Sequence, residues 1–560
     1  MAELRSVTSR RTMSAESTVL KQYRSPGTAI GRFVARRTAK SAAFWALGFG
    51  AYVASKIVGF AAAYPNAQAR AAIATTFGNN VGLDAILGRP RDMWEVAGVG
   101  AWNTLGVMVL VGSIWSFLLA TRYFRGEEEN GRSELLLTGQ TTMARSALNT
   151  LLGITASIGI LFVITAAAFV LVGQVHSVDY SVSAGIFFAL AVAMGMLVFA
   201  YIGAFASQLM PTRARAATFS AITLGIFFLL RAMADSTNAT WPANFTPLGW
   251  VENLRPLYDS KPLWLIPLAL FAALVAGMTV WLAGRRDLGE SVYADKDSAR
   301  PKYGFLNTPL GSAIRLTRAK TIGWLLGAIA IGYAFGKLTQ SVVSALGASS
   351  STVTVLDRLA QTKAQNVIVT GFLGAAFLLI MVILMCYVAS AVGAVRDTEG
   401  QGYLDNLLVR AVGRTQWLSG RTILIAGSVV IAVACGTAAI WAGMLGENFG
   451  ISLKTICEAG ANMLAAPLFT LGFGVLVFGV MPRLTTILTY SVIAWSFLLD
   501  MVSSGLHLNH WLLDTSVFYH ITLAPAVNPR WSSAIVLIGL GCLGVAIGMW
   551  RFHTRDLQSE

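Results

Sequence analysis

The residues best suited to chemistry stand in one charged stretch, RGEEENGRSELLL, from Arg125 to Leu137. It holds four carboxylates and two arginines, while the segments on either side are almost wholly apolar. Charged groups around a run of leucines suit a docking surface for another protein, with charge at the rim and leucine at the centre. For a single stretch of this kind, the alternative is a solvated loop.

The stretch has a second copy, RDTEGQGYLDNLL, from Arg396 to Leu408, 271 residues further along the chain. At the same shift, LMPTRARAATFS falls on VMPRLTTILTYS. A spacer loop does not require the same residue order twice, whereas docking to a two-fold partner does. The matched pairs are Arg125 with Arg396, Glu128 with Glu399, Gly131 with Gly402, Glu134 with Asp405 and, after one gap, Arg145 with Arg414.

Each copy is expected to contain a short helix and a turn. The three consecutive glutamates from Glu127 to Glu129 suit the positive end of a helix dipole. Gly131 and Gly402 can supply the turn, because glycine adopts backbone conformations that other residues avoid.

The elements that position the two copies are membrane-spanning helices. The chain has 560 residues, of which 55% are hydrophobic and 12% charged, and its mean hydropathy is +0.63. Soluble domains carry about a quarter charged residues, and continuous apolar runs of about twenty residues cross a bilayer as helices. The net charge of +15 lies mainly beside these runs, as topology signals do, so it does not indicate nucleic acid binding.

The hydropathy pattern predicts an all-α polytopic protein with twelve spans in two parallel repeats of six. Lys and Arg are frequent in the N-terminal segment and in residues 121–146, 285–320 and 394–416, so these segments and both termini are expected in the cytoplasm. The predicted spans are 41–62, 96–120, 147–172, 181–208, 215–235, 263–284, 321–338, 367–393, 417–443, 459–480, 484–505 and 533–551.

The expected organisation places each repeat after a basic segment. A cytoplasmic segment (1–40) precedes the first repeat (41–284), a cytoplasmic linker (285–320) precedes the second (321–551), and a cytoplasmic tail (552–560) follows. Both basic segments end in a half-apolar stretch, AIGRFVARRTAK and PLGSAIRLTRAK. Each stretch is expected to form an amphipathic helix on the inner membrane surface, and a plain basic flank is the alternative.

The sequence holds no nucleotide-binding or catalytic motif. A P-loop needs GxxxxGK[ST] after a strand, and the nearest match, IGYAFGKLT at 331–339, lacks the first glycine and the final hydroxyl residue. HExxH and GxSxG are absent, and His507 and His510 fit an interfacial loop better than a metal site. We therefore expect neither an enzyme nor a cofactor or metal bound by this chain.

Charged residues inside apolar runs are costly in a membrane, so each is a candidate for a polar cavity, a gate or an ion-coupling site. Lys56, Arg231 and Asp500 are such residues. The alternative for each is snorkelling to the interface or a structural ion pair. Snorkelling is favoured for Arg231, near the outer end of its span, whereas Asp500 is the carboxylate that an ion-coupled transporter could use.

The pattern R-x-x-E-x-x-G-x-x-[ED]-x-L-L after the second span of each half, the amphipathic stretch and the six-span unit resemble the permeases of ABC-2 type ABC exporters. The fused form, with NFTPLGWVENLRPLY and ITLAPAVNP before the last span of each half, resembles the actinobacterial tetronasin-type permeases of antibiotic and multidrug efflux. The resemblance covers nearly the whole chain and implies a multi-pass protein of the bacterial inner membrane.

The resemblance implies that each charged copy is a coupling helix that fits a cleft of a separate ATPase, with two ATPase copies per chain and with ATP and Mg bound by that partner. Thr398 and Gly400 replace two glutamates in the second copy, so the two docking sites are expected to be unequal. The coupling residues would be Arg125, Glu127, Glu128, Gly131, Glu134 and Arg145 in the first copy and Arg396, Glu399, Gly402, Asp405 and Arg414 in the second.

The resemblance also places a substrate path between the halves, lined by the second and fifth spans of each. Aromatic side chains there would suit hydrophobic or amphiphilic, drug-like molecules, and a packing or lipid-facing role is the alternative. The outer segments 236–262 and 506–532 could dip back into the membrane as a gate. The aromatic residues are Trp102, Trp115, Phe117, Phe227, Phe228, Phe377, Tyr387, Trp495 and Phe497.

Three other functions stay open on the sequence. The exporter could carry an envelope lipid or glycolipid. An ion-coupled secondary transporter, which also commonly has two repeats, would need no ATPase and would depend on a group such as Asp500. A membrane scaffold would bind partners and transport nothing.

Overall fold

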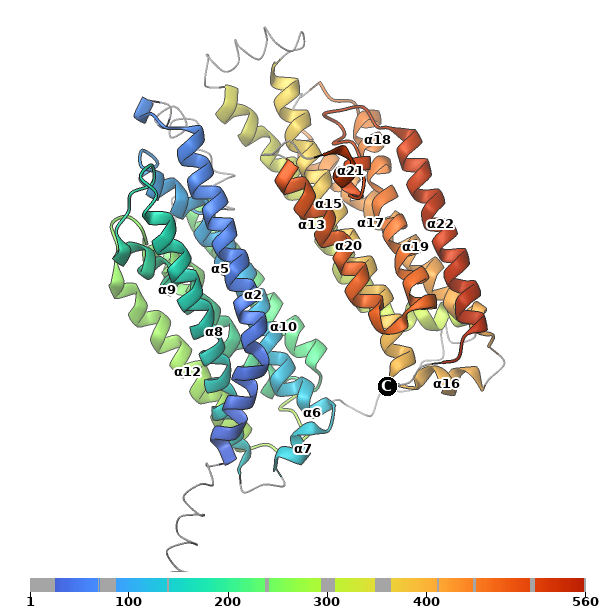
Figure 1. Ribbon diagram of the computed structural model, residues 1–560, viewed down its shortest axis with the longest axis horizontal. Coiled ribbons are helices and arrows are strands. Elements are labelled where there is room, and N and C mark those ends of the chain that lie inside the picture. The colour runs from blue at the N-terminus through green and yellow to red at the C-terminus, as the bar shows by residue number, and fades with distance from the viewer. Residues whose placement is uncertain are drawn as a thin grey trace, which may run out of the picture. The chain divides into compact units, whose positions relative to one another are not determined.

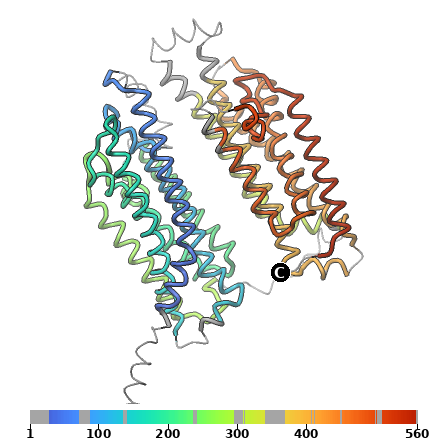
Figure 2. The backbone as a smooth tube through the Cα atoms, in the orientation of Figure 1, coloured from blue at the N-terminus to red at the C-terminus, as the bar shows by residue number. Residues whose placement is uncertain are grey.

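The computed structural model of the chain describes residues 26–68, 70, 87–137, 141–236, 241–293, 308–347, 364–409, 412–446, 450–503 and 509–557. The chain divides into two compact units, Met1–Ala299 and Arg300–Glu560, and the boundary falls within the predicted linker (Figures 1 and 2). Every regular element among the described residues is a helix, as the apolar runs predict. His507 and residues 1–25 and 294–307 lie outside the described residues.

The first unit is built from long helices joined by short ones (Figure 1). Its long helices are α2 Pro26–Ala63, α5 Val96–Thr121, α8 Met143–Gly173, α9 Val182–Leu209, α10 Arg213–Ser236 and α12 Leu265–Ala283. Its short elements are η1 Arg122–Gly126, α6 Glu127–Glu129, α7 Arg132–Leu137, η2 Trp241–Phe245, α11 Pro247–Asn253 and η3 Pro262–Trp264.

The second unit follows the same order of long helices. These are α13 Pro309–Gly347, α15 Ala364–Gly400, α17 Arg414–Met444, α19 Ala465–Val480 with α18 Leu453–Met463 before it, α20 Thr485–Ser503 and α22 Trp531–Thr554. The short elements are α16 Tyr403–Leu408, η4 Pro482–Leu484, α21 His510–Leu513 and η5 Phe518–His520.

Eleven helices among the described residues are long and apolar enough to cross a membrane. Each overlaps one of the predicted spans, so the chain is an all-α polytopic membrane protein. The remaining predicted span, 484–505, corresponds to α20, which is helical but is not one of the eleven. The count of twelve therefore stays a prediction.

The basic stretches before the first and seventh predicted spans differ from the expectation of separate surface helices. Each belongs to one uninterrupted helix, α2 of 38 residues and α13 of 39 residues. Such a helix is about 57 Å long, well beyond the ~30 Å hydrocarbon core. Gly31 and Gly153 allow the basic end of α2 to pack closely against α8. A Cβ on Gly31 would lie 2.9 Å from the Asn149 carbonyl oxygen.

The two units repeat one packing scheme. In both units the first helix packs on the third (α2 on α8, α13 on α17), the second on the fourth (α5 on α9, α15 on α19), and the fourth on the sixth (α9 on α12, α19 on α22). Glycines allow the closest approaches, because a Cβ on Gly336 would lie 2.3 Å from the Ile440 oxygen and one on Gly472 2.0 Å from the Gly541 oxygen. The sequence repeat thus has a counterpart in helix packing within each unit.

Candidate partner-docking site

Both charged stretches fold into the same turn at one end of their unit. The second long helix of each unit continues to Glu129 or to Gly400, and a glycine then reverses the chain into a short helix, α7 or α16. Gly131 has φ of +68° and Gly402 of +72°, a region that favours glycine. The Gly131 amide donates to the Glu128 carbonyl and the Gly402 amide to the Glu399 carbonyl, both at 3.0 Å. The turns predicted at the two glycines are present.

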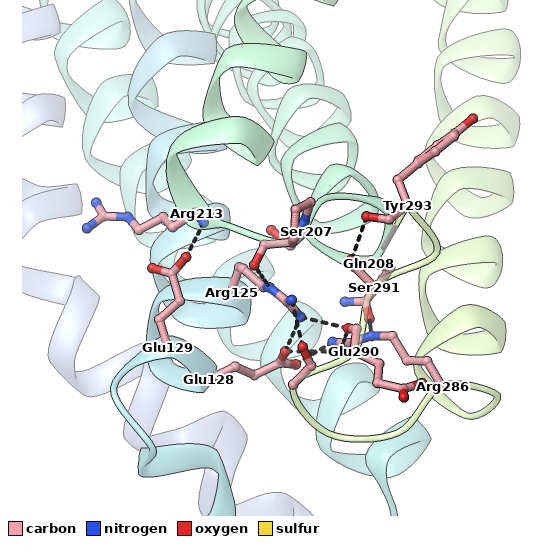
Figure 3. Close-up of polar contacts among 12 residues, drawn as sticks. Arg125, Glu128, Glu129, Ser207, Gln208, Arg213, Arg286, Glu290, Ser291 and Tyr293 are labelled. Carbon is pink, nitrogen blue, oxygen red and sulfur yellow. Dashed lines mark hydrogen bonds and ion pairs between the residues drawn. The ribbon is translucent and has the colours of Figure 1, made fainter. Parts of the chain in front are cut away.

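In the first unit, Arg125 is the centre of a buried cluster (Figure 3). It lies in the single π-helical turn η1 and is 3% exposed. Its Nε donates to the Pro211 carbonyl at 2.8 Å, and its Nη1 donates to Glu128 Oε2 at 2.7 Å. Nη1 and Nη2 also donate to the carbonyls of Glu290 and Gly289, both at 2.9 Å. One guanidinium thus joins the end of α5 to the α9–α10 turn and to the chain after α12.

Arg286, which follows α12, completes this cluster. Its Nη1 donates to Glu128 Oε2 at 3.0 Å, its Nη2 pairs with Glu128 Oε1, and its Nε donates to Gln208 Oε1 at 2.7 Å. The side chains of Arg286 and Glu128 are both less than a tenth exposed. We call Arg125, Glu128 and Arg286 the first clasp. Removing one partner from a buried ion pair of this kind costs about 3–5 kcal/mol, so the first clasp is a stiff connection.

The neighbouring glutamates also have partners inside the first unit. Glu129 Oε1 accepts from the Arg213 amide at 2.6 Å, at the first residue of α10 (Figure 3), where a carboxylate favours the helix dipole. Glu127 is buried and lies 3.6 Å from Arg132. The glutamate run therefore ties α6 to α10 and α7 as well as to the clasp.

The second unit repeats the arrangement with Arg396, Glu399 and Arg555, which we call the second clasp. Arg555 follows α22 and binds Glu399 with both Nη atoms, at 2.6 Å to Oε1 and 2.8 Å to Oε2. Arg396 Nη1 lies 3.6 Å from Glu399 Oε2, and Glu399 is 2% exposed. Arg414 Nη1 donates to the Arg555 carbonyl at 2.7 Å. The same three residue types thus hold the second turn.

Sequence reasoning missed the third member of each clasp, Arg286 and Arg555. The signal was available, because Arg-Asp-Leu occurs at 286–288 and again at 555–557, just after the last long helix of each unit. The two tripeptides differ by 269 positions (555 − 286), the same shift that relates Arg145 to Arg414 (414 − 145). A three-residue match at a chain end is short, and the longer charged stretches obscured it.

The predicted coupling residues fall into two groups. Arg125, Glu127, Glu128, Arg396 and Glu399 are buried or nearly so and position the turns. Gly131, Glu134, Arg145 and Asp405 are exposed, and Gly402 and Arg414 are half-buried. The exposed surfaces of the two short helices differ. In the first, Arg132 and Glu134 are exposed, and in the second, the position of Arg132 is taken by Tyr403, which is 61% exposed beside Asp405.

The charges predicted inside the membrane have different surroundings. Arg231 is buried on α10, where its Nε lies 3.3 Å from Asp235 Oδ2 and its guanidinium lies 5.0 Å from the Phe228 ring centroid. It therefore forms a structural ion pair, one of the alternatives, rather than reaching out by snorkelling. Lys56 is exposed on α2 with its Nζ 6.0 Å from the Tyr52 ring centroid, and Asp500 lies on an exposed face of α20.

The aromatic residues predicted for a substrate path have different surroundings within their own units. Trp102 and Phe228 line a single cavity in the first unit. Phe117 and Phe377 are buried core residues, and Phe227 packs on Phe199 with ring centroids 6.3 Å apart. The remaining four are Trp115 and Tyr387, which contact the first helix of their own units at Ser41 and Thr321, and Trp495 and Phe497, which are exposed on α20.

Comparison with known proteins agrees with this architecture. Residues 306–553 match the family described as the C-terminal domain of the multidrug efflux system permease Rv1217c. A protein of Mycobacterium tuberculosis, named multidrug efflux system permease protein Rv1217c, is 27% identical over 506 residues, which cover 88% of each chain. The chain is therefore a multi-pass membrane protein that is similar to multidrug efflux permeases, along most of its length to the mycobacterial protein and over residues 306–553 to the family of that C-terminal domain.

Proposed function

We propose that the chain is the permease subunit of an ATP-driven exporter, and that α6–α7 and α16 dock a separate ATPase. The observation that carries the proposal is the duplicated turn, held in each unit by the same buried Arg–Glu–Arg clasp. Two equivalent projections from one chain suit two copies of one partner. The ATP and Mg belong to that partner, and both chain termini lie in the cytoplasm at the bacterial inner membrane.

The clasps explain how docking would move the permease. A force on α6–α7 reaches α5 through Arg125, α10 through the Glu129–Arg213 contact, and the chain after α12 through Arg286. Buried ion pairs resist deformation because separating them leaves charge unpaired. The turn and these three helix ends would therefore move as one body when the ATPase changes conformation.

The cargo we propose is a hydrophobic or amphiphilic, drug-like compound. Support comes from the name of the mycobacterial relative, a multidrug efflux permease, and from a cavity in the first unit whose walls include aromatic and aliphatic side chains. An envelope lipid is also an amphiphile. The two kinds of cargo are distinguished by identifying the compound that accumulates in cells that lack the chain.

The test is capture of the tagged full-length chain from its native host in mild detergent, with quantification of the co-purified proteins. A variant with Glu134→Lys and Asp405→Lys reverses one exposed charge on each short helix. The matched control is Glu458→Lys, a partly exposed acid on α18 that pairs with Lys454. We expect an ATPase at two copies per chain, lost in the double variant and retained in the control.

A chain that exports without any captured ATPase would overturn the proposal. The alternative would then be an ion-coupled transporter, and replacement of Asp500 by Asn would be examined next. Capture of the ATPase by the double variant at the level of the unmodified chain would instead show that docking uses other residues.

A further inference from the structure

The first unit contains a cavity that the clasps do not involve. It lies between the first half of α5, the end of α10 and the segment from α11 to Tyr258, and its empty space is about 560 Å³, counting the part open to solvent. Ligand pockets in proteins combine apolar walls with a few polar groups. The lining of this cavity includes Trp102, Gly106, Phe228, Arg231, Glu252 and Tyr258.

The charged groups around this cavity are balanced. Arg231 pairs with Asp235 at 3.3 Å. The Arg89 guanidinium donates to the carbonyls of Asp235 and Ala234, and the Arg89 amide donates to Glu252 Oε1 at 3.1 Å. Arg89, Arg231 and Glu252 line the cavity, and Asp235 lies behind Arg231. When both carboxylates are ionised, these four groups carry no net formal charge, and a charged ligand would add an unpaired buried charge. An uncharged ligand with a hydrogen-bonding group meets no such penalty.

Aromatic rings form much of the remaining wall. The Trp102 indole is fixed by a 2.7 Å hydrogen bond to the Gly88 carbonyl, and Phe228 stacks on Arg231. Burial raises the pKa of Tyr258 to about 12, so its hydroxyl stays protonated and can donate a hydrogen bond at any physiological pH. Rigid aromatic walls with a polar end fit a molecule that has an apolar ring system and a polar head.

Gly106 keeps the cavity open. The position of a Cβ on Gly106 lies 3.5 Å from Arg231 Nη1 and 3.4 Å from the Leu87 carbonyl oxygen, so a larger side chain would enter the cavity. Trp115 on α5 and Tyr387 on α15 make matching contacts to the first helix of their units, so they align the two helices. In this alignment, the turn of α15 that corresponds to Gly106 carries Phe377 and Leu378. Phe377 is buried in the core of the second unit. A glycine therefore lines the cavity in the first repeat, whereas a buried phenylalanine lies on the corresponding turn of the second.

The loop beside the cavity is strained. Arg255, Leu257 and Asp259 have φ of +49°, +75° and +29°, although none is glycine. Residues held in such conformations cost about 1–3 kcal/mol each and cluster at ligand and switch sites. Pro256, between the first two of these residues, lines the cavity.

We infer that this cavity binds an uncharged amphiphile, with its ring system against Trp102, Phe228 and Tyr258 and its polar head toward Arg231 and Glu252. The inference deepens the proposed export function, on which it rests for the identity of the cargo. The cavity would make the two units unequal in ligand binding as well as in docking.

The test uses two fluorescent probes that differ by one charge. N-phenyl-1-naphthylamine is uncharged, and 1-anilinonaphthalene-8-sulfonate carries a sulfonate on the same ring system. Each is titrated onto the full chain in lipid nanodiscs, with empty nanodiscs subtracted. We expect saturable binding of the uncharged probe and at least tenfold weaker binding of the sulfonate.

Variants then locate the site. Gly106→Phe should weaken binding of the uncharged probe at least tenfold, and Gly106→Leu, a milder filling, should weaken it less. The control is Gly225→Phe, since Gly225 lies on an exposed face of α10 with no atom near its Cβ position. Unchanged binding in both Gly106 variants, or equal affinity for the two probes, would overturn the inference. The assay needs no ATPase, so failure of ATPase capture would overturn the proposed function and leave this result standing.

Discussion

The two clasps hold the same turn with different surroundings. In the first unit, polar atoms receive the arginines: the Gln208 side chain accepts from Arg286, and the carbonyls of Pro211, Gly289 and Glu290 accept from Arg125. In the second unit, Arg555 lies 5.2 Å from the ring centroids of both Phe478 and Phe552. Among the described residues its Nε has no hydrogen-bond partner. Besides Glu399, Arg555 donates to the carbonyls of Asp556 at 3.0 Å and of Phe478 at 3.3 Å. Arg555 therefore has two backbone acceptors, its glutamate and two aromatic ring faces.

This comparison shows that a repeated turn can be kept while its support changes. The position of Ser207 in the first unit corresponds to Phe478 in the second, 271 residues later. Backbone carbonyls and an amide hold a guanidinium by hydrogen bonds, whereas ring faces hold it by cation–π attraction. The two supports should respond differently to substitution, although the turns they position are alike.

The largest difference in stability between the two clasps is expected when the central glutamate of each is replaced. Glu399→Ala would leave Arg555 buried beside aromatic rings, and we expect it to destabilise the second unit by about 3–5 kcal/mol. Glu128→Ala should destabilise less, because Arg125 and Arg286 retain three carbonyl acceptors and one amide acceptor, whereas Arg555 retains two carbonyls. Thermal unfolding of the detergent-solubilised chain measures both, with Glu458→Ala as an exposed control. Equal losses in the two clasp variants would contradict the comparison.

A truncation at the end of the chain should affect the turn of the second unit and leave that of the first unchanged. Ending the chain after Thr554 removes Arg555 and leaves Glu399 without its bidentate partner, whereas ending it after Leu557 retains the clasp. We expect the first truncation to speed amide hydrogen exchange in α16 at least tenfold and to leave α6–α7 unchanged. The longer chain should exchange like the full-length protein. Protection of α16 that survives the loss of Arg555 would show that the tail does not hold the turn.

A smaller effect is expected from the aromatic seat alone. Phe478→Leu removes one ring from Arg555, and we expect a loss of about 1–3 kcal/mol from the cation–π contact and the vacated volume. The control is Phe469→Leu on the same helix, a half-buried residue that stacks on Phe473 and has no cation–π contact among the described residues. Unfolding temperatures measure both variants. A control variant as damaging as Phe478→Leu would mean that packing, and not the cation, explains the loss.

Much of the architecture follows from the sequence. Apolar runs predict the long helices, the repeated stretch predicts two equivalent turns, and Gly131 and Gly402 predict their left-handed corner. These features depend on local patterns that recur at a fixed spacing. They need no knowledge of which helices pack together.

The features that the sequence did not predict depend on packing. Arg125 and Glu128 read as surface charge, but partners from residues 208–211 and 286–290 bury them. The basic end of α2 is predicted as a surface helix, and Gly31 and Gly153 also bring it against α8. In each case the neighbour is distant in the chain, so charge and amphipathicity alone did not predict the contact.

The smallest effect concerns the equivalent aromatic residues, Trp115 and Tyr387. Trp115 Nε1 donates to Ser41 Oγ at 3.0 Å, whereas the Tyr387 and Thr321 hydroxyls are 3.4 Å apart. Ser41→Ala should therefore cost about 1 kcal/mol and Thr321→Val less, since the shorter hydrogen bond contributes more. Both are measured by thermal unfolding, and a double-mutant cycle with Trp115→Phe isolates the bond from the lost ring volume. A coupling energy near zero in that cycle would assign Trp115 a packing role only.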